Sequence, residues 1–85
     1  MDKSAILAEV TEIISDVLDQ PDLILGLDTT AEDVEGWDSF NHINIVVACE
    51  GKFGVKINTA EIEELRNVGE LVELIEKKTL ARAAR

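Results

Sequence analysis

The residues that could do chemistry gather in one short segment, Gly36 to Phe40, where a hydroxyl directly follows a carboxylate. Ser39 offers a nucleophilic oxygen, and the residues after it predict a helix, so this oxygen would lie at a helix N-terminus. Unpaired backbone N–H groups and the positive end of the helix dipole favour an anionic phosphate ester at such a place. An Asp-Ser pair more commonly serves only as a helix cap, so the residues alone leave both interpretations open.

A hydrolase is the first alternative, because Asp38, Ser39 and His42 have the residue types of a catalytic triad. Three groups within so short a stretch of one helix start cannot form the chain of nucleophile, base and orienting carboxylate. The sequence also lacks a Gly-x-Ser-x-Gly segment, and 85 residues leave little room for a substrate pocket with an oxyanion hole. We therefore expect no enzyme activity. His42 could contact a phosphate or a partner, although a lone helical histidine is more often simply exposed.

The charge of the chain restricts its partners. It carries 18 acidic and 8 basic residues, for a net charge of -10. Such a surface argues against nucleic acid and anionic membranes as partners, and it favours proteins with basic docking patches. No stretch approaches transmembrane length, so we expect no membrane insertion. The single cysteine, Cys49, excludes an internal disulfide, and no Cys/His spacing indicates a zinc site. We expect Cys49 to be a small buried hydrophobe and the protein to be cytoplasmic, since no export signal or transmembrane stretch is present.

The first element that must position Ser39 is an amphipathic helix over 4–18, capped by Asp2 or Ser4 and stopped before Pro21. Its predicted inward residues are Ile6, Val10, Ile13, Ile14 and Val17. A long loop from Gln20 to Trp37 follows, with one short helical turn after Thr30. We expect Leu23, Leu25 and Leu27 to anchor this loop to the core.

The second helix is predicted over Asp38 to Phe53, capped by Asp38 or Ser39 and ended by Gly51 and Gly54. Its β-branched residues would equally suit a buried strand, but length and capping favour a helix. The predicted inward residues are Ile43, Val46, Val47 and Phe53. With Leu71 and Ile75 they would frame an apolar interior.

Two further helix starts are marked by an asparagine three residues before a glutamate, at Asn58 and at Asn67. The first predicts a short helix with Ile62 and Leu65 inward, after an extended link over 55–57. The second predicts a helix from Val68 to about Lys78, whose buried residues are Val68, Leu71, Val72 and Ile75. The prediction is one all-α domain over 1–79, followed by a frayed basic tail over 80–85.

The segment from Gly36 to Phe40 resembles the phosphopantetheine attachment motif of acyl carrier proteins, in which an apolar residue follows Asp-Ser. Residues 43–50, 53–57, 61–62 and 67–71 resemble, in order, the second helix, following loop, short third helix and fourth helix of that family. The resemblance implies a four-helix bundle with three main helices, one short helix and a long loop between the first two. It further implies that Ser39 carries 4′-phosphopantetheine from coenzyme A. Asp38 would help to position the transferase and its metal.

The chain departs from the fatty-acid branch of the family on the second helix. Asn41 and Asn44 stand where acidic residues are usual, and Trp37 and His42 make the approach to Ser39 bulkier. A specialised pathway of fatty-acid, polyketide or similar biosynthesis is therefore the expectation. The residues expected to dock partners are Trp37, Phe40, Asn41, His42, Asn44 and Glu61.

The resemblance implies a monomer that works with a phosphopantetheinyl transferase, an acyl ligase or acyltransferase, and downstream synthase enzymes. Two alternatives stay open: an aminoacyl, D-alanyl or peptidyl carrier, and an unmodified acidic adaptor that only binds proteins. Two local readings stay open as well. Trp37 either fastens the loop or contacts a partner, and the carboxylates of Glu61, Glu63 and Glu64 form either a solvated helix face or a docking patch.

Overall fold

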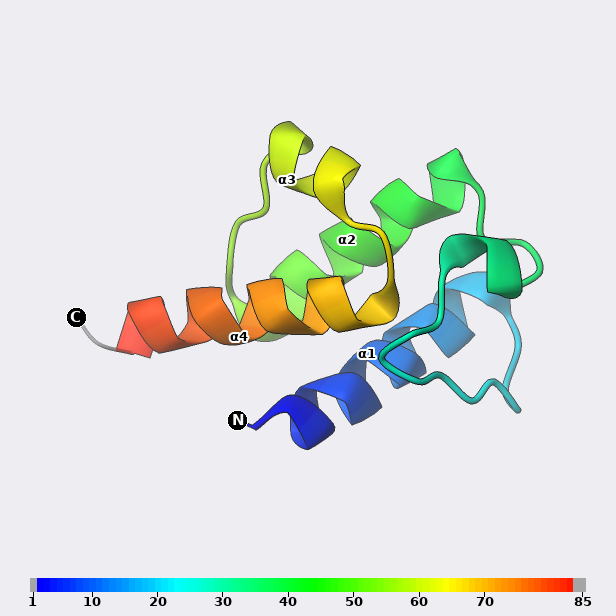
Figure 1. Ribbon diagram of the computed structural model, residues 1–85, viewed down its shortest axis with the longest axis horizontal. Helices are drawn as coiled ribbons and strands as arrows, with labels where there is room; N and C mark the ends of the chain where they lie inside the picture. Colours follow the sequence, from blue (N-terminus) through cyan, green and yellow to red (C-terminus); the bar gives the residue numbers. More distant parts are fainter. Residues whose placement is uncertain (1, 84–85) are drawn as a thin grey trace.

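The computed structural model describes residues 2–83, and these form an all-α fold without strands. The helices are α1 (Lys3–Leu18), α2 (Ser39–Phe53), α3 (Thr59–Glu64) and α4 (Val68–Ala83), with a 3-10 turn η1 (Ala31–Asp33) in the long α1–α2 loop. α1 packs against both α2 and α4, and the short α3 lies on the side of α4 away from α1 (Figure 1). The predicted arrangement of three main helices, one short helix and a long first loop is confirmed.

Helix α1 begins and ends where local sequence signals place it. The carboxylate of Asp2 caps the start by accepting a hydrogen bond from the Ala5 N–H at 2.8 Å. Asp19 ends the helix in the left-handed conformation, with φ of 55°, and Pro21 prevents its continuation. The fully buried residues are Ile6, Val10 and Ile14. The predicted inward residues Ile13 and Val17 lie at the edge of the core.

The α1–α2 loop is fixed to the body of the protein by its backbone as well as by its side chains. Leu25 is buried as predicted, but Leu27 is 43% exposed, so its side chain is not the predicted anchor. Instead, Gly69 donates its N–H to the carbonyl of Leu27 at 2.8 Å. Val68 donates to the carbonyl of Thr29, also at 2.8 Å. Because the first N–H groups of a helix have no partner inside it, the loop satisfies the start of α4.

The predicted turn after Thr30 is present as η1. Asp33 and Thr30 form a capping box, in which the Thr30 N–H donates to the Asp33 carboxylate at 3.0 Å. Val34, directly after the turn, is buried, and Leu23 earlier in the loop packs partly against the core. The loop therefore has a defined path into α2.

Helix α2 buries only two of its four predicted inward residues, Val46 and Phe53. Ile43 is 54% exposed and Val47 is 58% exposed, so the prediction that these two residues face inward is wrong. At roughly 100° per residue, they lie on the opposite side of the helix from the buried set. That set is Ile45, Val46, Cys49 and Phe53. The apolar residues are so dense between Ile43 and Val47 that periodicity alone does not show which of them the other helices cover.

The end of α2 after Phe53 agrees with the prediction, whereas the end of α4 does not. α2 continues through Gly51 and ends only at Gly54, whose left-handed φ of 66° suits a residue without a Cβ. α4 does not end near Lys78 but continues to Ala83, through alanine and leucine residues that favour helix. Of the basic segment 80–85, residues 84–85 lie outside the described residues.

The core contains apolar side chains and no buried polar or charged ones among the described residues. From α4 it receives Val68, Leu71, Val72 and Ile75, as predicted. Cys49 is 0% exposed, and burial, with a smaller contribution from the neighbouring charge of Glu50, raises the pKa of its thiol to about 12. It is a small core residue, as expected. Among the described helices, none combines the length and the apolar character that a bilayer-spanning segment requires.

The contact between the loop and α4 predicts the effect of adding one methyl group. In Gly69→Ala the new Cβ would lie 2.7 Å from the Leu27 carbonyl oxygen and 3.2 Å from the Leu27 Cβ. Relief requires the loop backbone to move away from α4. We expect the free energy of unfolding to fall by about 1–3 kcal/mol in urea denaturation, as for other overpacking substitutions.

A matched control uses the other helical glycine. Gly51 lies inside α2, and a Cβ added there meets nothing within 4 Å. Gly51→Ala should therefore stabilise the protein by about 0.5–1 kcal/mol, because alanine loses less backbone entropy in a helix. Equal effects of the two substitutions would contradict the close contact between Gly69 and the loop.

Candidate functional site

Ser39 is the first residue of α2, and its side chain is exposed. The helix starts there because Asp38 is its N-cap: the Asp38 carboxylate accepts the N–H of Asn41 at 2.8 Å. The Asp38 carbonyl accepts the N–H of His42, also at 2.8 Å. Of the two predicted caps, Asp38 is the one used, which leaves the Ser39 hydroxyl without a structural task in the helix start.

The surroundings of Ser39 fit a phosphate ester. The backbone N–H groups of Ser39 and Phe40 make no hydrogen bond within the described residues, since Asp38 satisfies only the next two. Two free donors and the positive end of the helix dipole therefore lie beside the hydroxyl. A phosphopantetheine phosphate on the Ser39 oxygen would meet these donors, and no described contact blocks the oxygen.

Hydrogen bonds hold the backbone of the segment just before Ser39 in place. Gly36 turns the chain with a positive φ of 85°, which glycine adopts without strain. Its carbonyl accepts a hydrogen bond from the side-chain amide of Asn41 at 2.8 Å. The carbonyl of Glu35, one residue earlier, accepts a hydrogen bond from the side chain of Gln20. The segment that carries Ser39 is thus tied to both α2 and the end of α1.

Trp37 and His42 are both half-buried and contact each other. The indole Nε1–H of Trp37 donates to Nδ1 of His42 at 3.1 Å, and the two rings stack with centroids 6.0 Å apart. Nε2 of His42 lies 3.4 Å from the carbonyl oxygen of Ile62 in α3. The reading of His42 as simply exposed is therefore wrong, because it faces α3. Trp37 fastens the loop to α2, one of the two roles that the sequence leaves open.

A shallow groove of about 610 Å³ opens beside Ser39, between the start of α2 and α3. Its lining residues are Ala31, Trp37, Asp38, Ser39, His42, Ile43, Ile62, Glu63 and Leu65. The hydroxyl that could be modified is therefore at the edge of a mostly apolar surface. Ile62 and Leu65 are half-buried and face this groove as well as the core, which refines their predicted inward orientation.

The exposed side of α2 next to the groove is apolar and uncharged. Phe40 is 73% exposed, and with Ile43 and Val47 it forms one stripe along the helix. Asn41 and Asn44 lie beside it, with the amide of Asn44 3.4 Å from the side-chain oxygen of Asn41. Four of the predicted docking residues thus form or adjoin one end of the molecule: Trp37, Phe40, Asn41 and Asn44.

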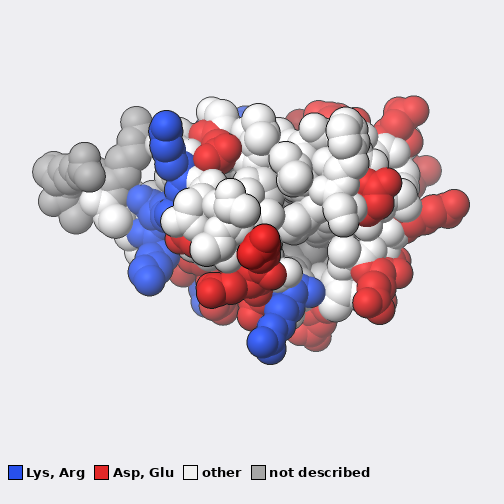
Figure 2. All heavy atoms as spheres, turned by 90° about the horizontal axis from the view of Figure 1, so that it is seen from above, with Lys and Arg blue, Asp and Glu red and all other residues white. Residues whose placement is uncertain are grey.

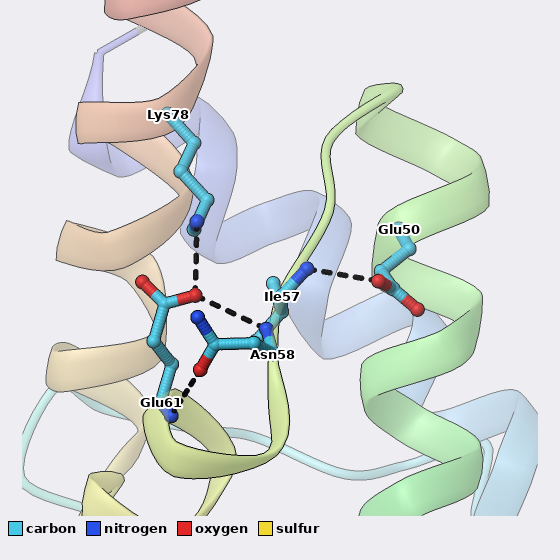
Figure 3. Close-up of polar contacts among 5 residues, drawn as sticks. All are labelled: Glu50, Ile57, Asn58, Glu61 and Lys78. Carbon is cyan, nitrogen blue, oxygen red and sulfur yellow. Dashed lines mark hydrogen bonds and ion pairs between the residues drawn. The ribbon is translucent and has the colours of Figure 1, made fainter.

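The half-buried side chain of Glu61, by contrast, makes its polar contacts with other residues of this chain (Figure 3). Its carboxylate accepts the N–H of Asn58 at 3.1 Å, while the Asn58 side chain accepts the N–H of Glu61 at 2.9 Å, so the predicted capping box is present. The same carboxylate pairs with Lys78 of α4 at 3.0 Å. Glu61 therefore braces α3 against α4, and Glu63 and Glu64 are the exposed carboxylates of this helix.

Glu50 has a positioning role that sequence reasoning missed. Its carboxylate accepts the backbone N–H of Ile57 at 2.8 Å, which ties the link before α3 to the side of α2 (Figure 3). Val55 and Ile57 are buried and Lys56 is exposed, the alternation of the predicted extended link. The spacing of seven residues follows no local pattern, so only the folded structure brings the two groups together. Ala31, at the groove, was missed for the same reason.

The sequence matches one family model and is similar to known acyl carrier proteins. The family model for the phosphopantetheine attachment site matches residues 8–75. The acyl carrier protein of Thermotoga maritima is 33% identical over 76 residues, which cover 89% of this chain and 94% of the relative. That of Acidothermus cellulolyticus is 33% identical over 81 residues, or 95% of this chain and 96% of the relative.

Solved structures match over similar lengths. The solution structure of a holo acyl carrier protein from Geobacter metallireducens superposes with a TM-score of 0.82 at 37% identity, covering 92% of this chain and 88% of that one. The crystal structure of the Thermotoga maritima protein gives a TM-score of 0.86 at 26% identity, with 96% and 95% covered.

The brace at Glu61 predicts a dependence of stability on pH. The Asn58 N–H, and secondly Lys78, hold the pKa of Glu61 below its ordinary value of 4.5. Because the folded pKa is the lower one, the charged carboxylate stabilises the fold above pH 4.5, and this contribution is lost as pH falls through the folded pKa. Urea denaturation across the acidic range should therefore show a shallower loss of stability for Glu61→Gln, since glutamine keeps the capping geometry without the charge.

The expected loss of stability in Glu61→Gln, and the choice of a control residue, both depend on how exposed these carboxylates are. The ion pair with Lys78 is partly solvated, so we expect Glu61→Gln to cost no more than about 1 kcal/mol at neutral pH. Glu63→Gln removes a carboxylate of the same helix that has no hydrogen-bond or ion-pair partner among the described residues. Its free energy of unfolding should fall with decreasing pH as steeply as that of the wild type. If both variants kept that slope, Glu61 would not be the brace.

Proposed function

This chain belongs to the acyl carrier protein family, whose members carry a covalent 4′-phosphopantetheine, and from that premise we propose that Ser39 is the residue that carries the group. The observation behind the proposal is the exposed hydroxyl at the first position of α2, beside two backbone N–H groups that have no partner among residues 2–83. A phosphodiester there gains hydrogen bonds and a favourable dipole, which few other surface hydroxyls offer.

In the modification, the Ser39 oxygen would form a phosphodiester bond while the pyrophosphate bond of coenzyme A breaks and the adenosine bisphosphate leaves. The hydroxyl proton has to go to the transferase, because no basic side chain among the described residues is hydrogen-bonded to Ser39. Asp38 lies next to the attachment oxygen, with its carboxylate at the exposed surface. We assign it a second role, in recognition by the transferase and its metal.

In the proposed carrier function, the protein presents an acyl group to partner enzymes and does not itself catalyse a reaction. Bound through its phosphate, the group supplies a terminal thiol that holds an acyl group as a thioester, which keeps the acyl carbon electrophilic. What this chain contributes is the fixed position of Ser39 and the surface around it. A tether anchored there raises the effective concentration of the acyl group at each enzyme that docks on that surface.

The partners we propose are the modifying transferase, an acyl ligase or acyltransferase, and the downstream synthase enzymes. The charge distribution supports docking at the Ser39 end. No lysine or arginine lies between Lys3 and Lys52, and the end of the molecule formed by the α1–α2 loop shows acidic side chains without basic ones in the view of Figure 2. Basic patches on partners would be steered to this end, where Phe40, Ile43 and Val47 are available for apolar contact.

We further propose that the cargo belongs to a specialised pathway rather than to general fatty-acid synthesis. The amides of Asn41 and Asn44 leave the exposed side of α2 less acidic than the loop before it. A partner would therefore make electrostatic contacts mainly with the α1–α2 loop and apolar contacts mainly with α2. A cytoplasmic monomer fits this role, in line with a chain whose one cysteine is buried.

The deciding experiment is the intact mass of the protein after incubation with coenzyme A and a promiscuous phosphopantetheinyl transferase. We expect one adduct on the wild type and none on Ser39→Ala. Ser4→Ala is the control, because it removes another exposed serine of a helix first turn and should leave the adduct unchanged. A folded wild type without an adduct, or an adduct that persists in Ser39→Ala, would refute the assignment.

The two roles given to Asp38 can be separated. Asp38→Asn keeps a side-chain oxygen for the Asn41 N–H, so its Tm should match the wild type, whereas Asp38→Ala should lose about 0.5–2 kcal/mol of stability with the cap. If the charge also serves recognition, the initial rate of modification of Asp38→Asn should fall about tenfold or more, the size of a lost charged hydrogen bond. A normal rate in Asp38→Asn would leave Asp38 as a cap only.

A further inference from the structure

The Trp37–His42 pair connects three elements at the groove. Trp37 ends the α1–α2 loop, His42 lies in the first turns of α2, and the carbonyl of Ile62 belongs to α3. The Trp37 Nε1–H donates to His42 Nδ1 at 3.1 Å, and His42 Nε2 lies 3.4 Å from the Ile62 oxygen. The neutral imidazole with its hydrogen on Nε2 satisfies both contacts at once. We call this chain of contacts the latch.

A second, much smaller pocket lies behind the latch. It has about 20 Å³ of room, and its lining residues are Ala31, Trp37, His42, Leu65, Arg66, Asn67 and Leu71. The groove beside Ser39 and this inner pocket share Ala31, Trp37, His42 and Leu65. The latch residues therefore form part of the wall between the open groove and the interior.

The inner pocket borders the core at Leu71 and the surface at Arg66. It has room for about one water molecule. Leu71, on its far side, is 1% exposed and belongs to the core cluster. An alkyl chain that passes from the groove through this pocket toward Leu71 has to separate the rings of Trp37 and His42.

We propose that the latch, given the role of Ser39 proposed above, keeps the thioester-linked group in the groove and out of the core. The groove is large enough for this task at about 610 Å³, and Ser39 lies on its rim. Ile43, Ile62 and Leu65 supply an apolar floor, while the carboxylate of Glu63 lies at its border. A group resting there stays at the surface, within reach of a docked enzyme.

This arrangement selects a class of cargo. A long, purely aliphatic chain gains most from burial inside the core, and the latch opposes that burial because opening it breaks the indole–imidazole hydrogen bond and the ring packing. Short acyl groups, or those with polar substituents, lose nothing by staying in a groove with polar groups at its edge. Trp37 and His42 are thus positioning residues that set the specificity of the carrier for short or polar acyl groups.

The test compares loaded forms of the full chain. A promiscuous transferase and butyryl-, octanoyl- or dodecanoyl-coenzyme A give three acylated proteins, each verified by intact mass, and their Tm values are measured. We expect the wild type to show the same Tm with all three chains. His42→Leu removes both contacts of the latch, so its Tm should rise from the butyryl to the dodecanoyl form by about 4 °C or more, as methylene groups become buried.

The dependence on chain length is the informative quantity, because a merely structural role of His42 would lower every Tm equally. Trp37→Phe serves if His42→Leu does not fold, since it keeps one aromatic ring but removes the N–H donor and the second ring of the indole; we expect the same rise. Gln20→Leu is the matched control: it also removes a side-chain contact that fixes the loop, the bond to the Glu35 carbonyl, but it lines neither pocket. Its Tm should not depend on chain length.

Trp37 is the one tryptophan of the sequence, so its fluorescence reports on the latch directly. In the wild type the emission should not change between the butyryl and dodecanoyl forms. A wild-type Tm that climbs with chain length as steeply as that of the variants, or variants that show no climb, would overturn the latch while the loading of Ser39 stands. Failure of the loading itself would refute both proposals, and intact mass distinguishes that case at the first step.

Discussion

The hydrogen bond between the Asp38 carboxylate and the Asn41 N–H determines where α2 begins, and the geometry around Ser39 depends on that single start. A shift of the helix start by one residue would rotate the following side chains by roughly 100° relative to the rest of the fold. Ser39 would then leave the rim of the groove, and His42 would no longer face α3. The cap also decides which backbone donors are left free. It uses two and leaves the N–H groups of Ser39 and Phe40 for a ligand.

The loop before this cap belongs to the rigid part of the molecule. Its carbonyls at Leu27 and Thr29 satisfy the first turn of α4, and Gln20 holds the carbonyl of Glu35 just ahead of Gly36. The middle of the loop is therefore connected to α4 by backbone hydrogen bonds, and its last part is connected to the end of α1 by the side chain of Gln20. For this reason the acidic side chains of the loop have fixed positions relative to Ser39, and a partner meets a preformed surface.

The sequence was most informative where the determining interaction is local. The caps at Asp38 and Asn58 and the left-handed end at Gly54 follow from residues within one helical turn, and all were predictable. At Asn67 the pattern was only half right. Its side chain accepts the Glu70 N–H as expected, but the Glu70 carboxylate accepts the N–H of Arg66 rather than that of the cap.

Features that depend on contacts between elements were not predictable. The exposure of Ile43 and Val47 depends on which side of α2 the other helices cover, and nothing within the apolar run encodes this. The contact of His42 with Ile62 joins residues from different helices through a backbone oxygen, which has no side-chain signature in sequence. The family resemblance predicted the fold, which is confirmed, and pointed to Ser39, whereas the groove and the residues that line it are visible only in the packed structure.

The burial of Cys49 has a consequence for a protein that holds thioesters. A cysteine thiolate exchanges readily with a thioester, and an accessible one would move the cargo from the tether onto the protein, where no enzyme could collect it. Cys49 is fully enclosed and, with its pKa near 12, it stays protonated at physiological pH. The chain thereby offers no competing thiol of its own, so a thiol-specific alkylating reagent applied to the folded carrier should react with the thiol of the tether and not with Cys49.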